Sequence, residues 1–364
     1  MNQVHPLRLL IKALLLFILA NLLFSIFNPP VGRASAYNVL FPGRTRFPFG
    51  GGIQENNITV DDLDAMFASH IITAPKRLDE FRVLILGDSS VWGTLLRADQ
   101  TISAQFNAVN LMCSEKQLHF YNLGYPHPSL IQDSIILDQA IDYEPDLIIW
   151  MVTLNAVRQR PMNEFLLENF DRVAAFDRRF GLHPEYESAA PEPKTFYEQT
   201  LIGQRNQLAR LLLLQSLGPV WAGTGLDIAQ NTRYEKLSND QSASLNFAGL
   251  KEPADIHAYL QLEYLKAGIQ RSGNIPVLVV NEPIYIATGT SADVRYNTMY
   301  PRWAFDQYRQ ILAKDAASYR WNYLDLWDAI PPEHFTNNPL HLDVKGELLL
   351  ANLLSPAVSK IGCP

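Results

Sequence analysis

The sequence predicts a three-layer α/β sandwich built on a parallel sheet of about five strands. Short, continuously apolar segments alternate with longer segments of helical periodicity, and the apolar segments lack the polar alternation of a half-exposed strand. Such strands are buried on both faces, so helices must cover both sides of the sheet. The 364 residues, 48% apolar and 18% charged, suffice for one large domain with an insertion and exclude a disordered chain.

The chain begins with a segment suited to a membrane. Residues 9–27 are apolar except for Lys12, Asn21 and Ser25, and an Asn-Pro-Pro sequence at 28–30 ends the predicted helix. A helix of this length spans about 28 Å, which just crosses the hydrocarbon core of a bilayer.

Two export interpretations fit residues 1–36, which are either an uncleaved signal-anchor or a signal peptide. In the second, cleavage would follow the small residues at 34–36. We favour the anchor, because these small residues lie far beyond the apolar run. Both interpretations place the large domain outside the cytoplasm, attached to the cell membrane by a single pass or secreted. A buried core helix fits a terminal run this apolar less well.

The remaining elements follow in an alternating order. Residues 37–80 are rich in Pro, Gly and aromatics and are expected to form an extended spacer that ends in a short helix. The predicted strands are 81–86, 120–123, 147–152, 276–280 and 323–327. The predicted helices are 61–69, 101–112, 129–141, 254–271, 303–318 and 344–360, the last capped by Asp343.

An insertion interrupts this order after the third strand. Residues 156–253 contain no convincing strand, and helices are expected at 164–180 and 196–217. We therefore predict one α/β domain over 81–364 that carries a helical insertion at the edge of the sheet where α/β proteins bind ligands.

Candidate catalytic residues follow three of the predicted strands. Ser89, in a Gly-Asp-Ser sequence, lies at a tight turn that would expose its hydroxyl, and its own N–H can face an oxyanion. Gly124 would let a backbone N–H approach a ligand, and Asn155 could aim its amide at developing negative charge. His341 lies in a short polar loop before the last helix. Taken singly, each has an ordinary explanation as a turn, cap or surface residue.

In this order and placement, the four residues resemble the SGNH (GDSL-type) hydrolase family from residue 81 to about 360, outside most of the insertion. The resemblance implies Ser89 as nucleophile, His341 as general base, and Ser89, Gly124 and Asn155 as oxyanion donors. The family's acid stands three residues before the histidine, where this chain has Asn338, so Asn338 is the third candidate. An Asn can hold the imidazole but carries no charge.

Glu282, just after the fourth predicted strand, is a substitute acid that the sequence leaves open, and Asp88 and Glu282 are further candidates for substrate contact or secondary roles. The family's third block also contains an Asp after its Asn, and Ala156 stands at that position here.

The implied function is ester hydrolysis or O-acyl transfer through an acyl-Ser89 intermediate. Because membrane-tethered relatives of this fold modify envelope polysaccharides, the resemblance implies acyl esters of cell-envelope carbohydrate, or a small acyl ester, as substrate. No zinc-type spacing or phosphate loop is present, so no metal or cofactor is expected. The net charge of −7, with +5 on residues 1–54, argues against nucleic-acid binding by the large domain.

Two other functions stay open. Asn338 and the missing acid of the third block favour a weak or inactive envelope binding or assembly protein that keeps the fold. A lipid esterase is the other, because residues 211–214 with Val220 and Trp221 form an apolar stretch in the insertion. We favour the explanation of that stretch as ordinary core of the insertion.

The two cysteines are expected to pair. Cys113 ends the predicted helix 101–112, and Cys363 follows the last helix. In a flavodoxin-like sheet these helices lie side by side and run parallel, so their ends can meet. An oxidising compartment would then favour a Cys113–Cys363 disulfide, the alternative being two unrelated thiols.

Overall fold

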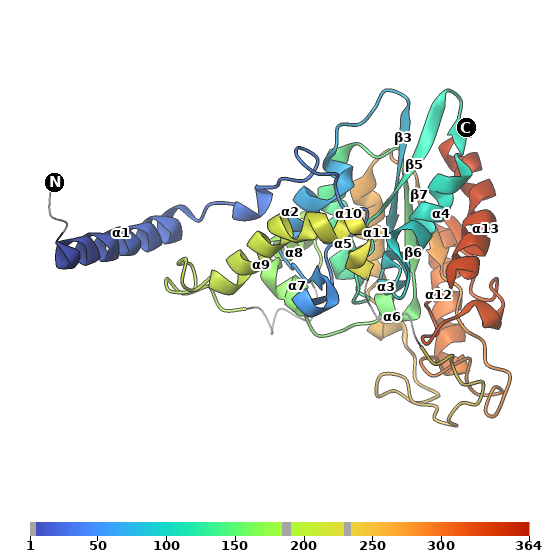
Figure 1. Ribbon diagram of the computed structural model, residues 1–364. Coiled ribbons are helices and arrows are strands. Elements are labelled where there is room, and N and C mark those ends of the chain that lie inside the picture. The colour runs from blue at the N-terminus through green and yellow to red at the C-terminus, as the bar shows by residue number, and fades with distance from the viewer. Residues whose placement is uncertain (1–4, 184–190, 229–233, 364) are drawn as a thin grey trace.

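The structure, a computed structural model, describes residues 5–183, 191–228 and 234–363 and contains the predicted parallel sheet (Figure 1). In sheet order its six strands are β4 (Met112–Cys113), β5 (Lys116–Asn122), β3 (Glu80–Leu86), β6 (Leu147–Val152), β7 (Val277–Asn281) and β8 (Asn322–Asp325). All neighbours pair in parallel except β4, which is antiparallel to β5. The five parallel strands thus have the chain order 2-1-3-4-5, which confirms the flavodoxin-like class.

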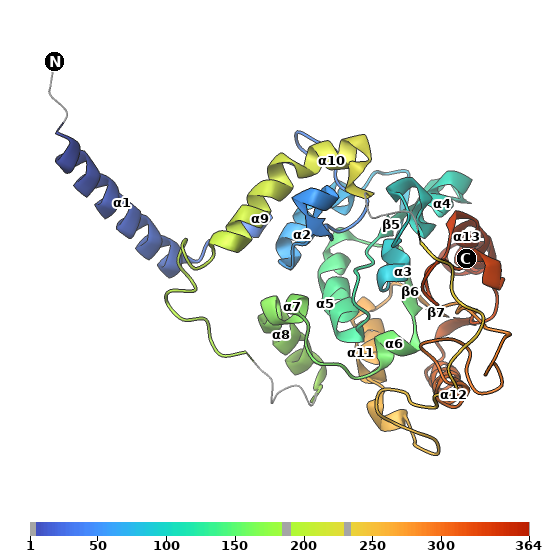
Figure 2. The same ribbon diagram turned by 60° about the horizontal axis from the view of Figure 1, so that its bottom comes forward.

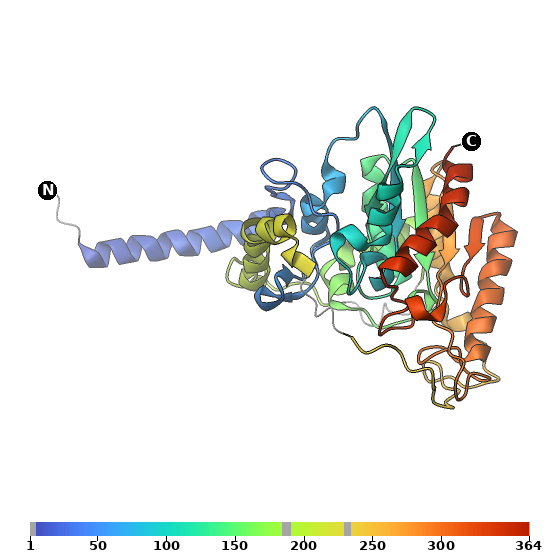
Figure 3. The same cartoon turned by 45° about the vertical axis from the view of Figure 1, so that its right-hand side comes forward.

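Helices cover both faces of the sheet, as the apolar strands require. The helices that pack on it are α2 (Leu63–Ser69), α4 (Ile102–Val109), α5 (Leu130–Ala140), α8 (Phe170–Phe180), α11 (Leu262–Ser272), α12 (Arg302–Tyr319) and α13 (Val344–Gly362). Side chains of β6 alternate between two cores: Ile148 and Trp150 pack among α2, α5, α8, α11 and α12, and Ile149 and Met151 pack under α4 and α13. Figure 3 shows α4 beside α13 on the second face.

Several helices are shorter than expected. Asn110 adopts a left-handed conformation (φ 54°) and ends α4 at Val109, and Ser114 (φ 53°) turns the chain so that β4 forms a hairpin with β5. The helix predicted over 254–271 begins only at Leu262. The sixth strand, β4, therefore forms a hairpin with β5 at the edge of the sheet. Apolar periodicity did not distinguish it from the end of the helix predicted over 101–112.

The insertion carries helices up to residue 228, whereas its described residues 191–204 and 234–253 form turns and coil, and residues 184–190 and 229–233 lie outside the described residues. Its helices are α6 (Leu154–Val157), α7 (Glu164–Glu168), α8, α9 (Arg205–Ser216) and α10 (Gly218–Thr224). The helix expected over 164–180 is interrupted at Asn169, whose side-chain amide donates to the Asp61 carbonyl. Strands are absent from the described parts of 156–253, as the sequence indicates.

The segment expected to be an extended spacer packs onto the domain. It forms a short hairpin of β1 (Gly51–Gly52) and β2 (Asn57–Ile58), and Phe47 is fully buried. The Arg46 guanidinium lies over the Trp92 ring at 4.2 Å and donates to three carbonyls at the end of α3 (Ser89–Trp92). The glycines and prolines correctly indicated an irregular backbone here. The buried side chains of Arg44 and Arg46 attach this segment to the rest of the domain.

Helix α1 (Pro6–Phe27) extends away from the domain (Figure 1). It is long and apolar enough for a membrane anchor or a signal sequence. Asn28 ends it in a left-handed conformation before the two prolines, as expected.

The predicted Cys113–Cys363 disulfide is present, with 5.3 Å between the two Cα atoms. Cys113 does not end a helix, however, because it lies in β4. The bond therefore joins the edge hairpin to the end of α13, and α13 packs against α4 as predicted.

Candidate active site

Ser89 lies where β3 turns sharply into α3. Gly87 takes a φ of 155°, and a Cβ there would approach a Val91 methyl group to 2.6 Å. The Asp88 side chain then caps α3 by accepting the Ser90 N–H at 2.9 Å. Ser89 is thereby placed at the carboxyl edge of the sheet, the ligand-binding edge of this fold class.

His341 is in direct contact with this serine. Ser89 Oγ and His341 Nε2 are 2.8 Å apart, although 252 residues separate them in the sequence. The loop that carries His341 is held by Thr336, whose N–H and hydroxyl both donate to the His341 carbonyl. Burial lowers the pKa of His341 to about 4, so the ring is neutral at pH 7.

The third candidate, Asn338, does not contact the imidazole ring. Its Oδ1 accepts the Leu340 N–H at 3.0 Å, and its backbone carbonyl accepts the His341 N–H at 3.2 Å. His341 Nδ1 is buried and has no hydrogen-bond partner among the described residues. Asp343 caps α13 through the Gly346 N–H, as expected. The arrangement is a Ser-His pair without an acid.

Glu282 does not supply the missing acid. Its Oε2 accepts the Ser90 hydroxyl at 2.5 Å. In the described part of the chain its buried Oε1 has no partner, and neither oxygen bonds His341. Burial, followed by the nearby Asp88 carboxyl, raises the pKa of Glu282 well above its usual range. The residue therefore supports the turn beside the nucleophile and has no hydrogen bond to His341 in this geometry.

Asp88 is also structural. It is 2% exposed, and its second oxygen lies 3.5 Å from the Thr153 hydroxyl as that group's acceptor. Burial raises its pKa. The carboxyl group is thus enclosed between α3 and the end of β6, where it supports the nucleophile turn.

Both further oxyanion candidates lie beside α3 or β6 but have partners within the protein. A Cβ on Gly124 would lie 2.5 Å from the Trp92 nitrogen, so only glycine permits this approach. The Gly124 N–H donates to Asn122 Oδ1 at 3.0 Å, and Asn155 Nδ2 donates to Met299 Sδ at 3.2 Å. A thioether is a weak acceptor, so an oxyanion can replace it readily.

Two arginines that sequence reasoning missed hold Asn155. Arg158 Nε donates to Asn155 Oδ1 at 3.3 Å, and Arg160 Nε donates to the Asn155 carbonyl at 3.2 Å. With Oδ1 held by Arg158, Nδ2 is the end of the amide that bonds only the weak Met299 Sδ acceptor. Their positions three and five residues after Asn155 carried no recognisable motif.

A groove of about 870 Å³ is lined mainly by apolar side chains, and neither Ser89 nor His341 is among its lining residues. The Phe49 ring forms one wall and contacts the Trp92 ring of α3 at 5.8 Å and the His127 ring at 5.6 Å. His127 is exposed and has a φ of 100°, rare for a residue with a side chain. Carboxyl groups of Asp61 and Glu164 also line the groove. Sequence reasoning gave no signal for His127, since its conformation depends on the folded loop.

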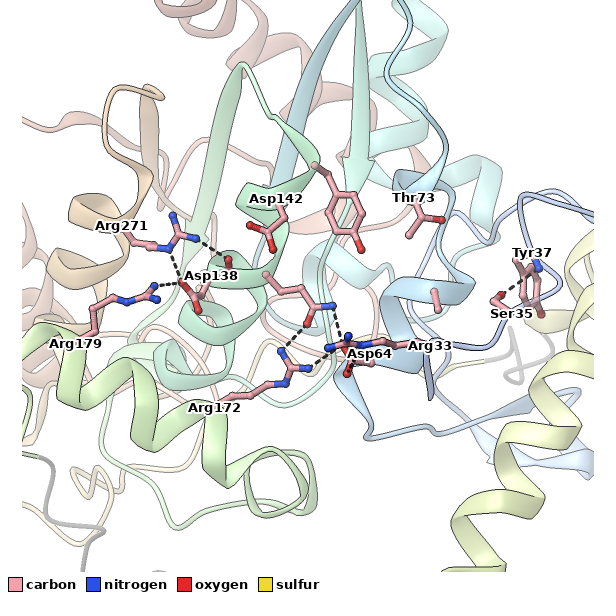
Figure 4. A pocket seen from close by; sticks show the side chains of 13 residues that line it. Arg33, Ser35, Tyr37, Asp64, Thr73, Asp138, Asp142, Arg172, Arg179 and Arg271 are labelled. Atoms are coloured by element: carbon pink, nitrogen blue, oxygen red, sulfur yellow. Dashed lines mark hydrogen bonds and ion pairs between the residues drawn. The ribbon is translucent and has the colours of Figure 1, made fainter. Parts of the chain in front are cut away.

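A second cavity, of about 670 Å³, is lined by charged side chains from the segment after α1 and from α2, α5, α8 and α11 (Figure 4). Asp64 accepts from Arg172 at 2.8 Å and from Arg33, which follows α1, at 3.3 Å. On another wall, Asp138 binds two arginines, from α8 and α11. The cavity therefore belongs to the attachment of α1 rather than to the Ser-His pair.

No protein-family model matches the sequence, and no curated protein matches it. Solved esterases and lipases are similar to this chain. A carbohydrate acetylesterase from Sinorhizobium meliloti is 14% identical, with 77% of this chain and 98% of that chain covered and a TM-score of 0.36. A lipase/acylhydrolase from Enterococcus faecalis is 14% identical (77% and 95% covered, TM-score 0.40), and an aryl esterase from M. smegmatis is 12% identical (77% and 99% covered, TM-score 0.37). Because these similarities are low, the function proposed below depends on the residues of this chain.

Proposed function

We propose that the chain is an SGNH-type serine esterase that acts through an acyl-Ser89 intermediate. The observation that carries the proposal is the 2.8 Å contact between Ser89 Oγ and His341 Nε2 at the carboxyl edge of the sheet. Nucleophile and base within hydrogen-bond reach are the signature of covalent acyl transfer.

In the proposed reaction, His341 Nε2 takes the Ser89 proton as Oγ attacks the ester carbonyl carbon. The tetrahedral oxyanion would be stabilised by the Ser89 N–H and by Asn155 Nδ2, and the Gly124 N–H would join them by exchanging its bond to Asn122 Oδ1 for one to the oxyanion. The imidazolium then returns the proton to the leaving alcohol oxygen as its bond to the acyl carbon breaks. Water, activated by the same nitrogen, hydrolyses the acyl-serine. An acceptor hydroxyl in place of water would give O-acyl transfer by the same steps.

We propose acyl esters of cell-envelope carbohydrate as the substrate class. The groove beside Phe49 supports this, because it offers an aromatic ring and the carboxyl groups of Asp61 and Glu164, and Phe49 contacts Trp92 of α3, the helix that begins with Ser89. The disulfide and α1 support a location outside the cytoplasm on a single-pass anchor, since disulfides persist in oxidising compartments.

The test is Ser89→Ala, compared with Ser90→Ala in the same turn. The wild type should hydrolyse p-nitrophenyl acetate and be labelled by a fluorophosphonate at Ser89. Ser89→Ala should lose both properties, and Ser90→Ala should keep the label. The absence of hydrolysis and of label from folded wild-type protein would contradict the proposal.

A non-catalytic binding role is the second candidate, and the unpartnered His341 Nδ1 favours it. A binding protein would retain an O-acetylated oligosaccharide without cleaving it. Mass spectrometry of the oligosaccharide after incubation separates the two functions, because only the esterase releases acetate.

A further inference from the structure

The last turns of α1 are part of the folded domain. Asn21 and Ser25, two of the three polar interruptions in the apolar run, are the buried residues of an otherwise largely exposed helix. The Ile202 N–H donates to Asn21 Oδ1 at 3.2 Å, and Ser25 Oγ donates to the Phe196 carbonyl at 3.4 Å. Asn21 and Ser25 therefore bind the insertion through hydrogen bonds. Loss of α1 would leave the Ile202 N–H and the Phe196 carbonyl without these partners.

An exposed apolar surface begins at this contact. Helix α9 buries Leu211 and Leu214 against the domain, where the Tyr37 hydroxyl donates to the Leu214 carbonyl. The opposite side of α9 and α10 is exposed, with Leu212 69% and Val220 57% accessible. We call the exposed large side chains of this segment the apolar rim: Phe196, Tyr197, Ile202, Leu212, Leu217 and Val220.

The structure thus divides the apolar stretch of the insertion between two roles. Leu211, Leu214 and Trp221 are buried in the core of the insertion, which was one explanation of the stretch. Leu212 and Val220 are exposed on its surface. These exposed apolar side chains lie beside α1, a helix long and apolar enough to cross a membrane. Such a surface is expected to bind an apolar partner.

We infer that the apolar rim is seated in the outer leaflet of the bilayer that α1 crosses, and that α1 is retained as the anchor. The inference rests on the proposed single-pass topology and not on the esterase reaction. Figure 2 shows α9 starting near the end of α1 and running across its axis, so α9 lies along the membrane plane when α1 crosses it. The buried side of α9 faces the domain, which leaves the rim facing the lipid. Phe196 and Tyr197, beside the last turns of α1, then lie at the depth where aromatic side chains are enriched in membrane proteins.

The experiment uses the full chain in nanodiscs of phosphatidylethanolamine and phosphatidylglycerol. Leu212→Cys and Val220→Cys are labelled with a maleimide fluorophore, which the paired native cysteines do not react with. Leu353→Cys is the matched control, because Leu353 is an exposed leucine (43%) on α13 at the far side of the domain. Lipids with a nitroxide on the upper acyl chain should quench the labels at 212 and 220 several-fold more than the label at 353.

Mass spectrometry of the same membrane fraction tests the anchor, and p-nitrophenyl acetate hydrolysis by the labelled variants reports separately on the Ser-His pair. A mature chain that begins after residue 36 overturns the inference, whatever the esterase activity. Labels at 212 and 220 that escape lipid quenching also overturn it, whether they are solvent-exposed or shielded by a second copy of the chain. Quenching of both labels in a chain that retains residues 1–36 supports it.

Discussion

Replacing Asn338 by Asp tests whether His341 works without a carboxylate. His341 Nδ1 has no partner among the described residues, and Asn338 lies three residues earlier in the same turn. Its Oδ1 accepts the Leu340 N–H, a bond that one oxygen of an aspartate can keep. The other oxygen would then place a negative charge in the loop that carries the ring, without a change in side-chain shape.

The structure sets the size of the expected effect. Burial lowers the pKa of His341 from 6.5 to about 4. At about 1.36 kcal/mol per pKa unit, this opposes the imidazolium by roughly 3.4 kcal/mol, or about 300-fold in rate if the transition state feels all of it. The aspartate must itself be desolvated, which offsets part of the gain. We therefore expect Asn338→Asp to raise kcat at pH 8 by about 10-fold.

The assay is the pH dependence of kcat/KM on p-nitrophenyl acetate. The base must be neutral to act, so the acidic limb of the wild type should lie near pH 4. A nearby carboxylate raises a histidine pKa, and the limb of Asn338→Asp should move towards 6.5. Asn338→Ala, which adds no charge, should leave the limb in place. A folded Asn338→Asp variant with unchanged kcat and an unchanged limb would refute the reasoning.

Two further predictions concern stability. Burial raises the pKa of Asp133 from 3.8 to about 8, so its contribution to folding is full below pH 3.8 and is lost as the pH rises through 8. Asp133→Asn keeps an oxygen acceptor for Trp150 Nε1 and should raise Tm at pH 8 but not at pH 4; equal changes at both pH values would contradict this. Reduction of Cys113–Cys363 should lower the free energy of unfolding in urea by about 2–5 kcal/mol, because the bond closes a long loop, and a Cys113→Ser, Cys363→Ser double variant should match the reduced protein. An unchanged midpoint of urea unfolding would show that the disulfide constrains neither the folded nor the unfolded state.

The sheet was predictable because its strands carry their own signal. All six side chains of β6 are buried, and a continuous apolar run of that length is typical of a strand covered on both faces. The hairpin of β4 gave no such signal. Its strand has only two residues, Met112 and Cys113, and the hairpin depends on the left-handed conformation of Asn110. The path of residues 37–58 was also missed, because Arg44 and Arg46 are buried through partners far along the chain.

The candidate site was predictable only as a set of positions. Chain order and strand ends located Ser89 and His341, and the structure brings them together. The direction of each polar side chain depends on its neighbours in space. Asn338 bonds Leu340, and Glu282 bonds Ser90, so neither reaches the imidazole. Burial and hydrogen-bond competition of this kind leave no pattern in a sequence.

The buried arginines of residues 37–58 help to connect α1 to the nucleophile turn. Arg46 binds the carbonyls at the end of α3, the helix that begins with Ser89. Arg44 forms a buried ion pair with Asp227 at 3.2 Å, next to α10. Through α9 and α10 the same insertion reaches Asn21 of α1. Helix α1, the insertion and the nucleophile turn are thus joined by buried contacts, so an anchored chain would hold Ser89 at a fixed height above the membrane. That geometry suits a substrate that is itself a fixed part of the cell envelope.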